Sequence, residues 1–338
     1  MNKRKLHIHY WIYIVIFCSL FTGCREDRKY KVAYLYPSKD FPRFVKEGGF
    51  MSERLKQLGA DVKIVDGEGD EAIQLSKGLK LLDDEIDLLI ITALNGNTIA
   101  PLVREAKDRG IPVMAYNRLI NNVDYDLYFT GNNEDIGRIF CETALSLKPH
   151  GNYVILAGDR FDRNGVELKE AIDSLLKPHV ANGNVNIVYE SYIENWDRDN
   201  AMNEMAQVIE SHGTDIDVVI SCYDPMAEGV ISVLKKYEID GNVVVTGQDA
   251  DLNAIKRIMQ GSQTLTVYHP CKVLGYKAAE LAFAILNGQS AKTIANARTF
   301  NGLEMIPTMQ VKSVAIKKDN IEKELVEVGE YTWDQINN

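Results

Sequence analysis

The chain has 338 residues, of which 46% are hydrophobic and 25% are charged, a composition typical of globular α/β proteins. This length favours two compact lobes over one. The formal net charge of −10 and the lack of any basic stripe argue against a nucleic-acid partner, and they give no support to an anionic ligand.

The N-terminal end has the pattern of a signal peptide. Basic residues at positions 3–5 precede an apolar stretch over positions 10–21. With about 12 residues this stretch is shorter than the ~20 that span a bilayer. It is followed by the letters TGC, and small residues before a single cysteine resemble a bacterial lipobox. We therefore predict a lipoprotein signal peptide over residues 1–23, acylation of Cys24, and a short tether over residues 24–29.

This lipid anchor predicts a protein of the cell envelope that faces the periplasm. Acidic residues follow the cysteine as Glu26 and Asp27, and they resemble a signal for export to the outer surface, so surface exposure is the alternative. An uncleaved signal anchor with an incidental cysteine is the other interpretation that the sequence leaves open.

From Tyr30 onward, short apolar runs alternate with amphipathic stretches of helical length. The expected strands are Val32–Leu35, Val62–Val65, Leu88–Ile91, Val113–Tyr116, Tyr153–Leu156, Val185–Tyr189, Val218–Ser221, Val243–Thr246 and Thr264–Tyr268. The expected helices are Phe44–Leu58, Ala72–Leu82, Ala100–Arg109, Ile136–Leu147, Val166–Leu176, Ala201–Ser211, Ala227–Tyr237 and Lys272–Leu286. Strands that alternate with helices in this way form parallel sheets covered on both faces, so the pattern predicts an α/β fold.

The alternation reads as two similar halves that exchange segments. A turn-rich stretch over residues 130–133 is the expected first crossover, and the chain is expected to recross near His269 and again near Asn301. The predicted N-terminal lobe is therefore residues 30–130 plus about 270–301. The predicted C-terminal lobe is residues 131–269 plus about 302–338. Several crossings make a hinge of limited freedom, which suits closure around a ligand.

The cysteines indicate neither a disulfide framework nor a metal site. Cys18 lies in the signal, and the three remaining beside Cys24 are far apart: Cys141, Cys222 and Cys271. The sequence contains no CxxC or HExxH motif, so we predict no metal and no cofactor.

Polar and aromatic residues follow the strands of the first half. Asn117 and Arg118 come directly after one strand, and the planar fork of an arginine matches two neighbouring sugar oxygens. A salt bridge from Arg118 to Asp124 is the alternative. Arg43 and Phe44 follow the first strand and could supply a guanidinium and a ring face, although such a pair on its own is more often a helix-start charge and a core ring.

The second half repeats this arrangement at its own strand ends. Asp162, Asn164 and Trp196 follow two of its strands, and Tyr223 with Asp224 follows a third. Aromatic faces stack on the C–H faces of sugar rings, while carboxylates and amides bind the hydroxyls. Packing in the core is the alternative role for the tryptophan.

One further acidic residue and a histidine end neighbouring strands in the stretch GQDADLNAIKRIMQGSQTLTVYHP. Asp249 lies just beyond a buried strand, and His269 ends the next one. Ligands in open α/β sheets bind outside the carboxyl ends of the strands, so both are candidates for one pocket. The alternative is that Asp249 caps the helix that begins near Leu252.

Several motifs resemble the xylose-binding branch of the type I periplasmic binding proteins of ABC sugar importers. The motifs that carry the resemblance are AYNRLINN, GNYVILAG, LLKPHV, GQDAD and IKRI. The resemblance covers nearly all of the chain after the signal. It implies two Rossmann-like lobes with parallel sheets, a hinge of three strands, and a monosaccharide in the cleft. The implied sugar contacts that keep the family's residue types are Arg43, Arg118, Asp162, Asn164, Trp196 and Asp249.

Five other implied pocket positions depart from the family. Phe44 stands for Trp, Asn117 for Asp, Lys169 for Arg, Tyr223 for Asn, and His269 for Lys. A site built to hydrogen-bond a hydroxyl rejects analogues strongly, so these changes predict a neutral pentose or similarly small monosaccharide, with D-xylose bound weakly. If His269 contacts the ligand, its titration predicts an affinity that changes between about pH 5.5 and 7.5.

The resulting hypothesis is a monomeric, lipid-anchored receptor that closes on a monosaccharide and presents it to the membrane permease of an ABC importer. The alternative is that the closed lobes dock onto a membrane sensor, either a sensor kinase or a chemoreceptor. An enzyme is not expected, because Asp162 and Asp249 lack the setting of a glycosidase pair and no nucleophile or phosphate motif occurs. A repressor is not expected either, because a signal peptide stands where DNA-binding helices would precede the lobes.

Overall fold

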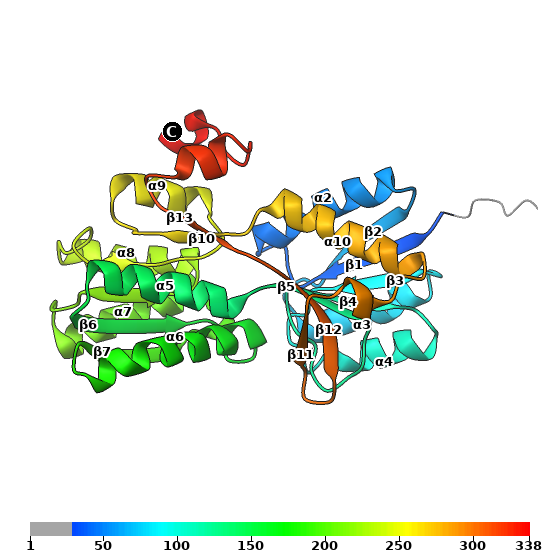
Figure 1. The fold of residues 1–338 in the computed structure, drawn as a ribbon, viewed down its shortest axis with the longest axis horizontal. Helices are drawn as coiled ribbons and strands as arrows, with labels where there is room; N and C mark the ends of the chain where they lie inside the picture. The colour runs from blue at the N-terminus through cyan, green and yellow to red at the C-terminus, as the bar shows by residue number, and fades with distance from the viewer. Residues whose placement is uncertain (1–28) are drawn as a thin grey trace, which may run out of the picture.

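The computed structural model describes residues 29–338, which form two lobes joined side by side (Figure 1). The predicted signal peptide and Cys24 lie outside the described residues. Within the described part, no helix combines the length and the apolar character needed to cross a bilayer.

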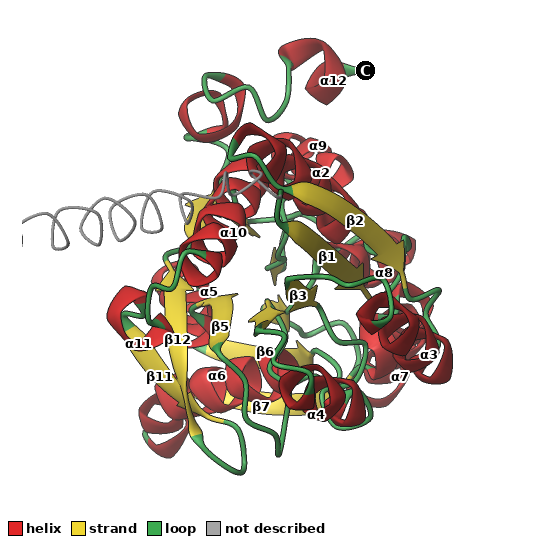
Figure 2. Ribbon diagram, turned by 90° about the vertical axis from the view of Figure 1, so that its right-hand side faces the viewer, coloured by secondary structure: helices red, strands yellow, loops and turns green. Residues whose placement is uncertain are grey.

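The first lobe is built on a seven-stranded sheet in the order β11-β12-β5-β4-β3-β1-β2. Its strands are β1 (Lys31–Tyr36), β2 (Asp61–Asp66), β3 (Leu88–Ile91), β4 (Val113–Tyr116), β5 (Leu127–Gly131), β11 (Ala297–Phe300) and β12 (Met305–Val311). All neighbours are parallel except β11, which runs antiparallel to β12. Its helices are α2 (Pro42–Gln57), α3 (Glu71–Leu82), α4 (Ala100–Asp108), α10 (Cys271–Leu286) and α11 (Ala291–Ile294). Figure 2 looks onto this lobe and shows α2 and α10 on one side of the sheet and α3 and α4 on the other.

The second lobe has a parallel four-stranded sheet in the order β7-β6-β8-β9, with a two-stranded sheet beside it. Its strands are β6 (Gly151–Ala157), β7 (Val185–Tyr192), β8 (Val218–Ser221), β9 (Val244–Val245), β10 (Thr266–Tyr268) and β13 (Val314–Ile316). A single bridge between Gln248 and Val267 connects the two sheets. Its helices are α5 (Asn133–Leu147), α6 (Arg163–Ala181), η2 (Glu194–Trp196), α7 (Arg198–His212), α8 (Asp224–Lys236), α9 (Leu252–Gln260), η3 (Glu322–Val326) and α12 (Trp333–Asn337).

The central strands are almost entirely apolar because helices cover both faces of each sheet. Every residue of β3, β4 and β8 is buried. Helices of both lobes begin at polar caps: Asp70 accepts a hydrogen bond from a backbone N–H at the start of α3 in the first lobe, and Asp162 does so at the start of α6 in the second. In each lobe the strands end at the edge of the sheet that faces the other lobe, and the residues that follow them line the space between the lobes.

The chain passes between the lobes three times, and one passage differs from the prediction. The first follows β5 and the second lies between β10 and α10, close to the expected positions. The third was expected near Asn301, but it comes after Val311, between β12 and β13. Asn301 and Gly302 instead form the turn of the β11–β12 hairpin, in which Gly302 has a φ of 94°. Because β12 pairs with β5 in the sheet of the first lobe, residues 302–311 belong to that lobe, which corrects the predicted domain boundary.

Candidate ligand-binding site

A narrow cavity lies between the lobes at the carboxyl ends of their strands. It is lined by Phe41, Arg43, Phe44, Asn117 and Arg118 of the first lobe and by Asp162, Asn164, Trp196, Tyr223, Gln248 and Asp249 of the second. Nine of the eleven residues proposed from the sequence are among them. About 40 Å³ is open to the centre of a water molecule, more than the roughly 10–15 Å³ that one water needs. The cavity therefore suits a small ligand and leaves no room for a polymer.

Polar side chains of the two lobes touch each other across this cavity. Arg43 Nη1 of α2 donates to Asp249 Oδ1 at 2.9 Å. Arg118 Nε lies 3.0 Å from Asp162 Oδ2, and Asn164 Nδ2 donates to the main-chain carbonyl of Asn117 at 2.9 Å and to its side-chain Oδ1 at 3.3 Å. Each contact joins one lobe to the other, so the structure shows the lobes closed together.

The Arg43 side chain is held by a buried carboxylate that the sequence reasoning missed. Glu47, one helical turn further along α2, accepts from Arg43 Nε at 2.7 Å and from the Tyr116 hydroxyl at 2.6 Å. Burial raises the pKa of Glu47, and the neighbouring Arg43 opposes that rise. The i, i+4 spacing of an arginine and a glutamate on one helix was the available signal. Glu47 therefore aims Arg43 toward Asp249.

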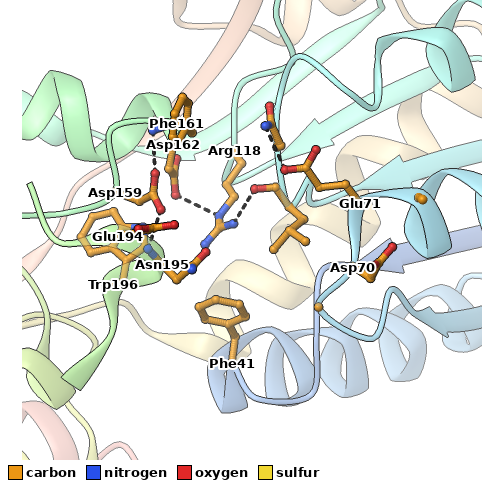
Figure 3. A pocket seen from close by; sticks show the side chains of 14 residues that line it. Phe41, Asp70, Glu71, Arg118, Asp159, Phe161, Asp162, Glu194, Asn195 and Trp196 are labelled. Atoms are coloured by element: carbon orange, nitrogen blue, oxygen red, sulfur yellow. Dashed lines mark hydrogen bonds and ion pairs between the residues drawn. The ribbon is translucent and has the colours of Figure 1, made fainter. Parts of the chain in front are cut away.

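Arg118 is held from several directions at once (Figure 3). Its Nη1 donates to the carbonyls of Ala93 and Leu94, both at 3.2 Å, and its guanidinium carbon lies 5.0 Å from the centre of the Phe41 ring. The alternative partner Asp124 pairs with Lys107 instead. A guanidinium held in this way is a preorganised donor for a ligand in the cavity.

Asp162 has two roles, because its other oxygen accepts from the Asn164 backbone N–H at 3.0 Å and caps α6. The same cap brings Asn164 to the cavity. On the far side of the cleft the buried Trp196 ring meets the Tyr223 ring edge to face at 6.1 Å. A Cβ on Gly158 would lie 2.0 Å from the Trp196 ring, so the ring packs directly on the backbone at that position. Trp196 therefore both packs and lines the site.

Asp249 lies in a loop with an uncommon backbone. Its φ is 94°, and Ala250 has a φ of 53°, in the left-handed region that few non-glycine residues adopt. The Ala250 N–H donates to Thr266 Oγ1, and the Asp251 N–H donates to the buried Asp224 carboxylate at 3.0 Å. The interpretation of Asp249 as a helix cap is wrong, because the cap position of α9 is Asp251 and the Asp249 carboxylate faces Arg43.

Asp224 also differs from its expected role. It was expected at the strand-end ring of polar groups, but it is fully buried beneath the loop and does not line the cavity. It accepts from Gln263 Nε2 and from Thr266 Oγ1, and burial raises its pKa well above the usual range. The side chain therefore positions the Asp249 loop.

Two residues proposed from the sequence do not line the cavity. Lys169 on α6 points its ammonium to Asp173 and Glu190, at 2.6 and 2.8 Å. His269 is buried behind Asp249: its Nε2 lies 3.9 Å from Asp249 Oδ1, and its Nδ1 lies 3.5 Å from Ser313 Oγ. Burial, reinforced by the charge of Arg43, keeps the pKa of His269 well below its ordinary value. The predicted change of affinity with pH required contact between His269 and the ligand, but His269 does not line the cavity and its pKa is shifted away from the range in which that change was expected.

Two lining residues were not proposed from the sequence. Phe41 stands before Pro42 at the start of α2, where it resembles an ordinary loop residue. Gln248 precedes Asp249, and its Oε1 is buried without a hydrogen-bond partner among the described residues. An acceptor of this kind is available to a ligand hydroxyl. Its position at a strand end was the signal that could have found it.

A wider cleft of about 620 Å³ with an acidic mouth shares Phe41, Arg118, Asp162 and Trp196 with the cavity. Asp70 and Glu71 stand on one side, and Asp159 and Glu194 on the other (Figure 3). Within residues 29–338, no group of histidine, cysteine or acidic side chains is arranged to hold a metal ion. The three described cysteines are free and buried.

Residues 32–290, well over half of the chain, match the family model of the periplasmic binding protein domain. This chain belongs to the periplasmic binding protein family. Two relatives of this binding protein are named D-xylose-binding periplasmic proteins. The relative from Haemophilus influenzae is 32% identical over 318 residues, which are 94% of this chain and 95% of the relative. The relative from Escherichia coli is 33% identical over 287 residues, 85% of this chain and 86% of the relative.

Solved structures of periplasmic binding proteins share the fold. An ABC transporter solute-binding protein from Clostridium phytofermentans with bound β-D-glucose has a TM-score of 0.83 and 27% identity, and the match covers 90% of this chain and 99% of that one. The predicted type I fold with two α/β lobes is confirmed. The relatives are solute-binding proteins, and on that ground the prediction of a binding protein without catalysis is confirmed.

Proposed function

We propose that this periplasmic binding protein is a lipid-anchored receptor that closes on a small neutral monosaccharide for uptake by an ABC importer. The observation that carries the proposal is the cavity between the lobes, in which donors and acceptors from both lobes converge beside aromatic rings. The xylose-binding names of two relatives and the glucose bound in a structural neighbour support a sugar as the ligand class.

The composition of the cavity favours a ligand with many hydroxyl groups. Arg43 and Arg118 supply donors, and Asp162, Asp249 and the free Gln248 oxygen supply acceptors. Each hydroxyl of a sugar both donates and accepts, so it satisfies such a mixed set. The flanking aromatic rings offer faces for the C–H groups of the sugar ring.

The charge of the cavity favours a neutral ligand. The two arginines that line it are each paired with an aspartate from the other lobe, so no cation is left over for an anionic sugar. The acidic mouth adds repulsion against carboxylates and phosphates that approach the cleft.

The ligand's identity is expected to differ from that of the xylose-binding relatives. Tyr223 stands where the family has a smaller amide and meets the Trp196 ring, which reduces the space between the lobes. Asn117, where the family has Asp, has a φ of 64°, and asparagine is among the residues that tolerate this region. These changes support a pentose or a similarly small sugar other than D-xylose as the tightest ligand.

Closure is the step that couples sugar binding to transport. Each cross-lobe pair exists only when the lobes are together, so a sugar that bridges the lobes shifts the protein toward the closed form. That form would be presented to the permease. Acylation at Cys24 would keep the receptor at the membrane, in an envelope compartment that faces the periplasm.

The test combines binding with growth. We expect calorimetry to show one-to-one binding of a neutral pentose or hexose, and deletion of the gene to abolish uptake of the same labelled sugar. Intact uptake together with loss of a sugar-dependent transcriptional response would contradict the transport role and would favour a sensor partner. Failure of all neutral monosaccharides to bind would contradict the sugar assignment itself.

A further inference from the structure

The C-terminal segment, residues 314–338, forms a small core of its own at the end of the second lobe (Figure 1). Its apolar residues pack on α9 and β10 rather than on the main core of either lobe. The buried members of this cluster are Ala250, Ile255, Ile258, Tyr268, Ile316, Ile321, Leu325 and Ile336. The segment is therefore fixed to the same structural unit that carries the Asp249 loop.

The segment also reaches across to the first lobe. One oxygen of Glu330 accepts from the Tyr268 hydroxyl at 2.8 Å, and the other is paired with the Lys46 ammonium of α2. The Lys46 Nζ also lies 5.5 Å from the centre of the Tyr331 ring. The Glu330 side chain is 8% exposed and that of Lys46 is 40% exposed, so the carboxylate is preorganised while the lysine approaches it from solvent.

Both ends of this contact are connected to the binding cavity. Lys46 lies three residues after Arg43 on α2, so the helix that brings Arg43 to Asp249 also brings Lys46 to Glu330. The Tyr331 hydroxyl donates to the Ala250 carbonyl at 2.9 Å, beside Asp249. The C-terminal segment therefore hydrogen-bonds to Ala250, one of the two residues with a left-handed backbone in the Asp249 loop. It also contacts α2, the helix whose Arg43 pairs with Asp249.

We propose that Glu330 and Tyr331 form a clasp with Lys46 that stabilises the closed form and positions Asp249, without contact to the ligand. The Lys46 contacts are made only when the lobes are together, so they bias the equilibrium between open and closed forms. A weaker clasp lowers the closed population and raises the apparent Kd of every bound sugar by one common factor. The order of preference among sugars is unchanged, which separates the clasp from residues that touch the ligand.

The expected changes in sugar affinity rest on the proposed function. The contacts of the clasp do not, because the protein makes them without a ligand. The central variant is Lys46→Glu, which sets a like charge against Glu330. Lys56→Glu is the matched control, because Lys56 is an exposed lysine of the same helix with no ion pair among the described residues. The double variant Lys46→Glu/Glu330→Lys restores opposite charges.

We expect Lys46→Glu to raise the Kd for D-xylose and for D-glucose by the same factor, about three- to tenfold, with most of the change in the dissociation rate. The double variant is expected to recover to within about threefold of the wild type, and Lys56→Glu to stay at the wild-type value. Tyr331→Phe keeps the ring for Lys46 but removes the hydrogen bond to Ala250. It is expected to weaken sugar binding while leaving the ligand-free scattering of the protein unchanged.

Small-angle X-ray scattering of the ligand-free proteins provides the readout that needs no sugar. We expect a larger radius of gyration for Lys46→Glu than for Lys56→Glu. If Lys46→Glu and Lys56→Glu have the same radius of gyration and the same sugar dissociation rate, the clasp is refuted. If neither sugar binds to any of the proteins, the scattering difference alone decides on the clasp, and the sugar assignment fails separately.

Discussion

Replacement of Asp249 by asparagine tests the cross-lobe pairing most sharply. Asp249 has a φ of 94°, and its side chain is 13% exposed. Asparagine tolerates a left-handed backbone better than most residues and keeps an acceptor oxygen of the same shape. The variant therefore removes the charge while leaving the loop in place. Its direct partner is Arg43, whose side chain is 9% exposed and which also contacts Glu47.

The magnitude follows from the burial of this pair. Burial disfavours the charge on Arg43, but Glu47 and Asp249 outweigh it and raise the pKa of the arginine well above its ordinary value. Loss of one of the two carboxylates weakens the hold on the guanidinium and removes a charged acceptor for a ligand hydroxyl. Hydrogen bonds to charged groups contribute about 1.5–3 kcal/mol. The affinity for the sugar should therefore fall by about 10- to 150-fold.

Isothermal titration calorimetry with the tightest-binding sugar is the assay. Asp108→Asn, an exposed aspartate on α4, is the matched control and should bind like the wild type. A double-mutant cycle with Arg43→Met should show that the two losses are not additive. Near-wild-type affinity in both Asp249→Asn and Asp249→Ala would refute the assignment of Asp249 to the site.

The other predictions concern the anchor, the aromatic wall, the specificity and the pH dependence of stability. Cys24→Ala should leave unlipidated precursor that moves out of the detergent phase, and partitioning like the wild type would contradict the anchor. Gly158→Ala should displace the Trp196 ring, lower the free energy of unfolding by about 1–3 kcal/mol and weaken sugar binding. Thermal unfolding and calorimetry measure the two effects, and an unchanged stability and affinity would mean that the ring adapts. Tyr223→Asn should improve D-xylose binding relative to the tightest sugar, and an unchanged ratio would exclude Tyr223 as the determinant. Burial, together with the nearby Asp249, raises the pKa of Asp251 from 3.8 to about 6, so the folded protein retains a proton there that the unfolded chain has lost. The free energy of unfolding should therefore fall as the pH rises through this interval, and Asp251→Asn should flatten the decline in chemical denaturation; equal slopes would show that Asp251 titrates normally.

The sequence predicted well those residues of the candidate site that follow the ends of strands. Apolar runs locate the strands, and in parallel sheets the residues that follow them meet at one edge. This reasoning, with the family resemblance, led to residues from both lobes, such as Arg118 and Asp249. It did not reveal the support behind them, because Glu47 and Asp224 act through contacts that depend on helix rotation and on distant loops.

The errors have equally local causes. Lys169 lies on the side of α6 that packs toward β7. Its ammonium therefore forms an ion pair with Glu190 of β7 and does not reach the cavity. His269 ends the expected strand, but the Asp249 loop lies between it and the cavity. The third crossing was misplaced because the pairing of β12 with β5 joins residues far apart in the sequence, which periodicity does not show.

The central claim is that the closed cavity holds a small neutral sugar. Calorimetric titration of the purified protein with D-xylose, L-arabinose, D-ribose, D-glucose and D-galactose tests it most directly. We expect one-to-one binding of at least one of them with a Kd of about 1 µM or tighter, and weaker binding of D-xylose than of the best ligand. Absence of heat from all five at millimolar concentration, or tight binding of an anionic sugar instead, would contradict it.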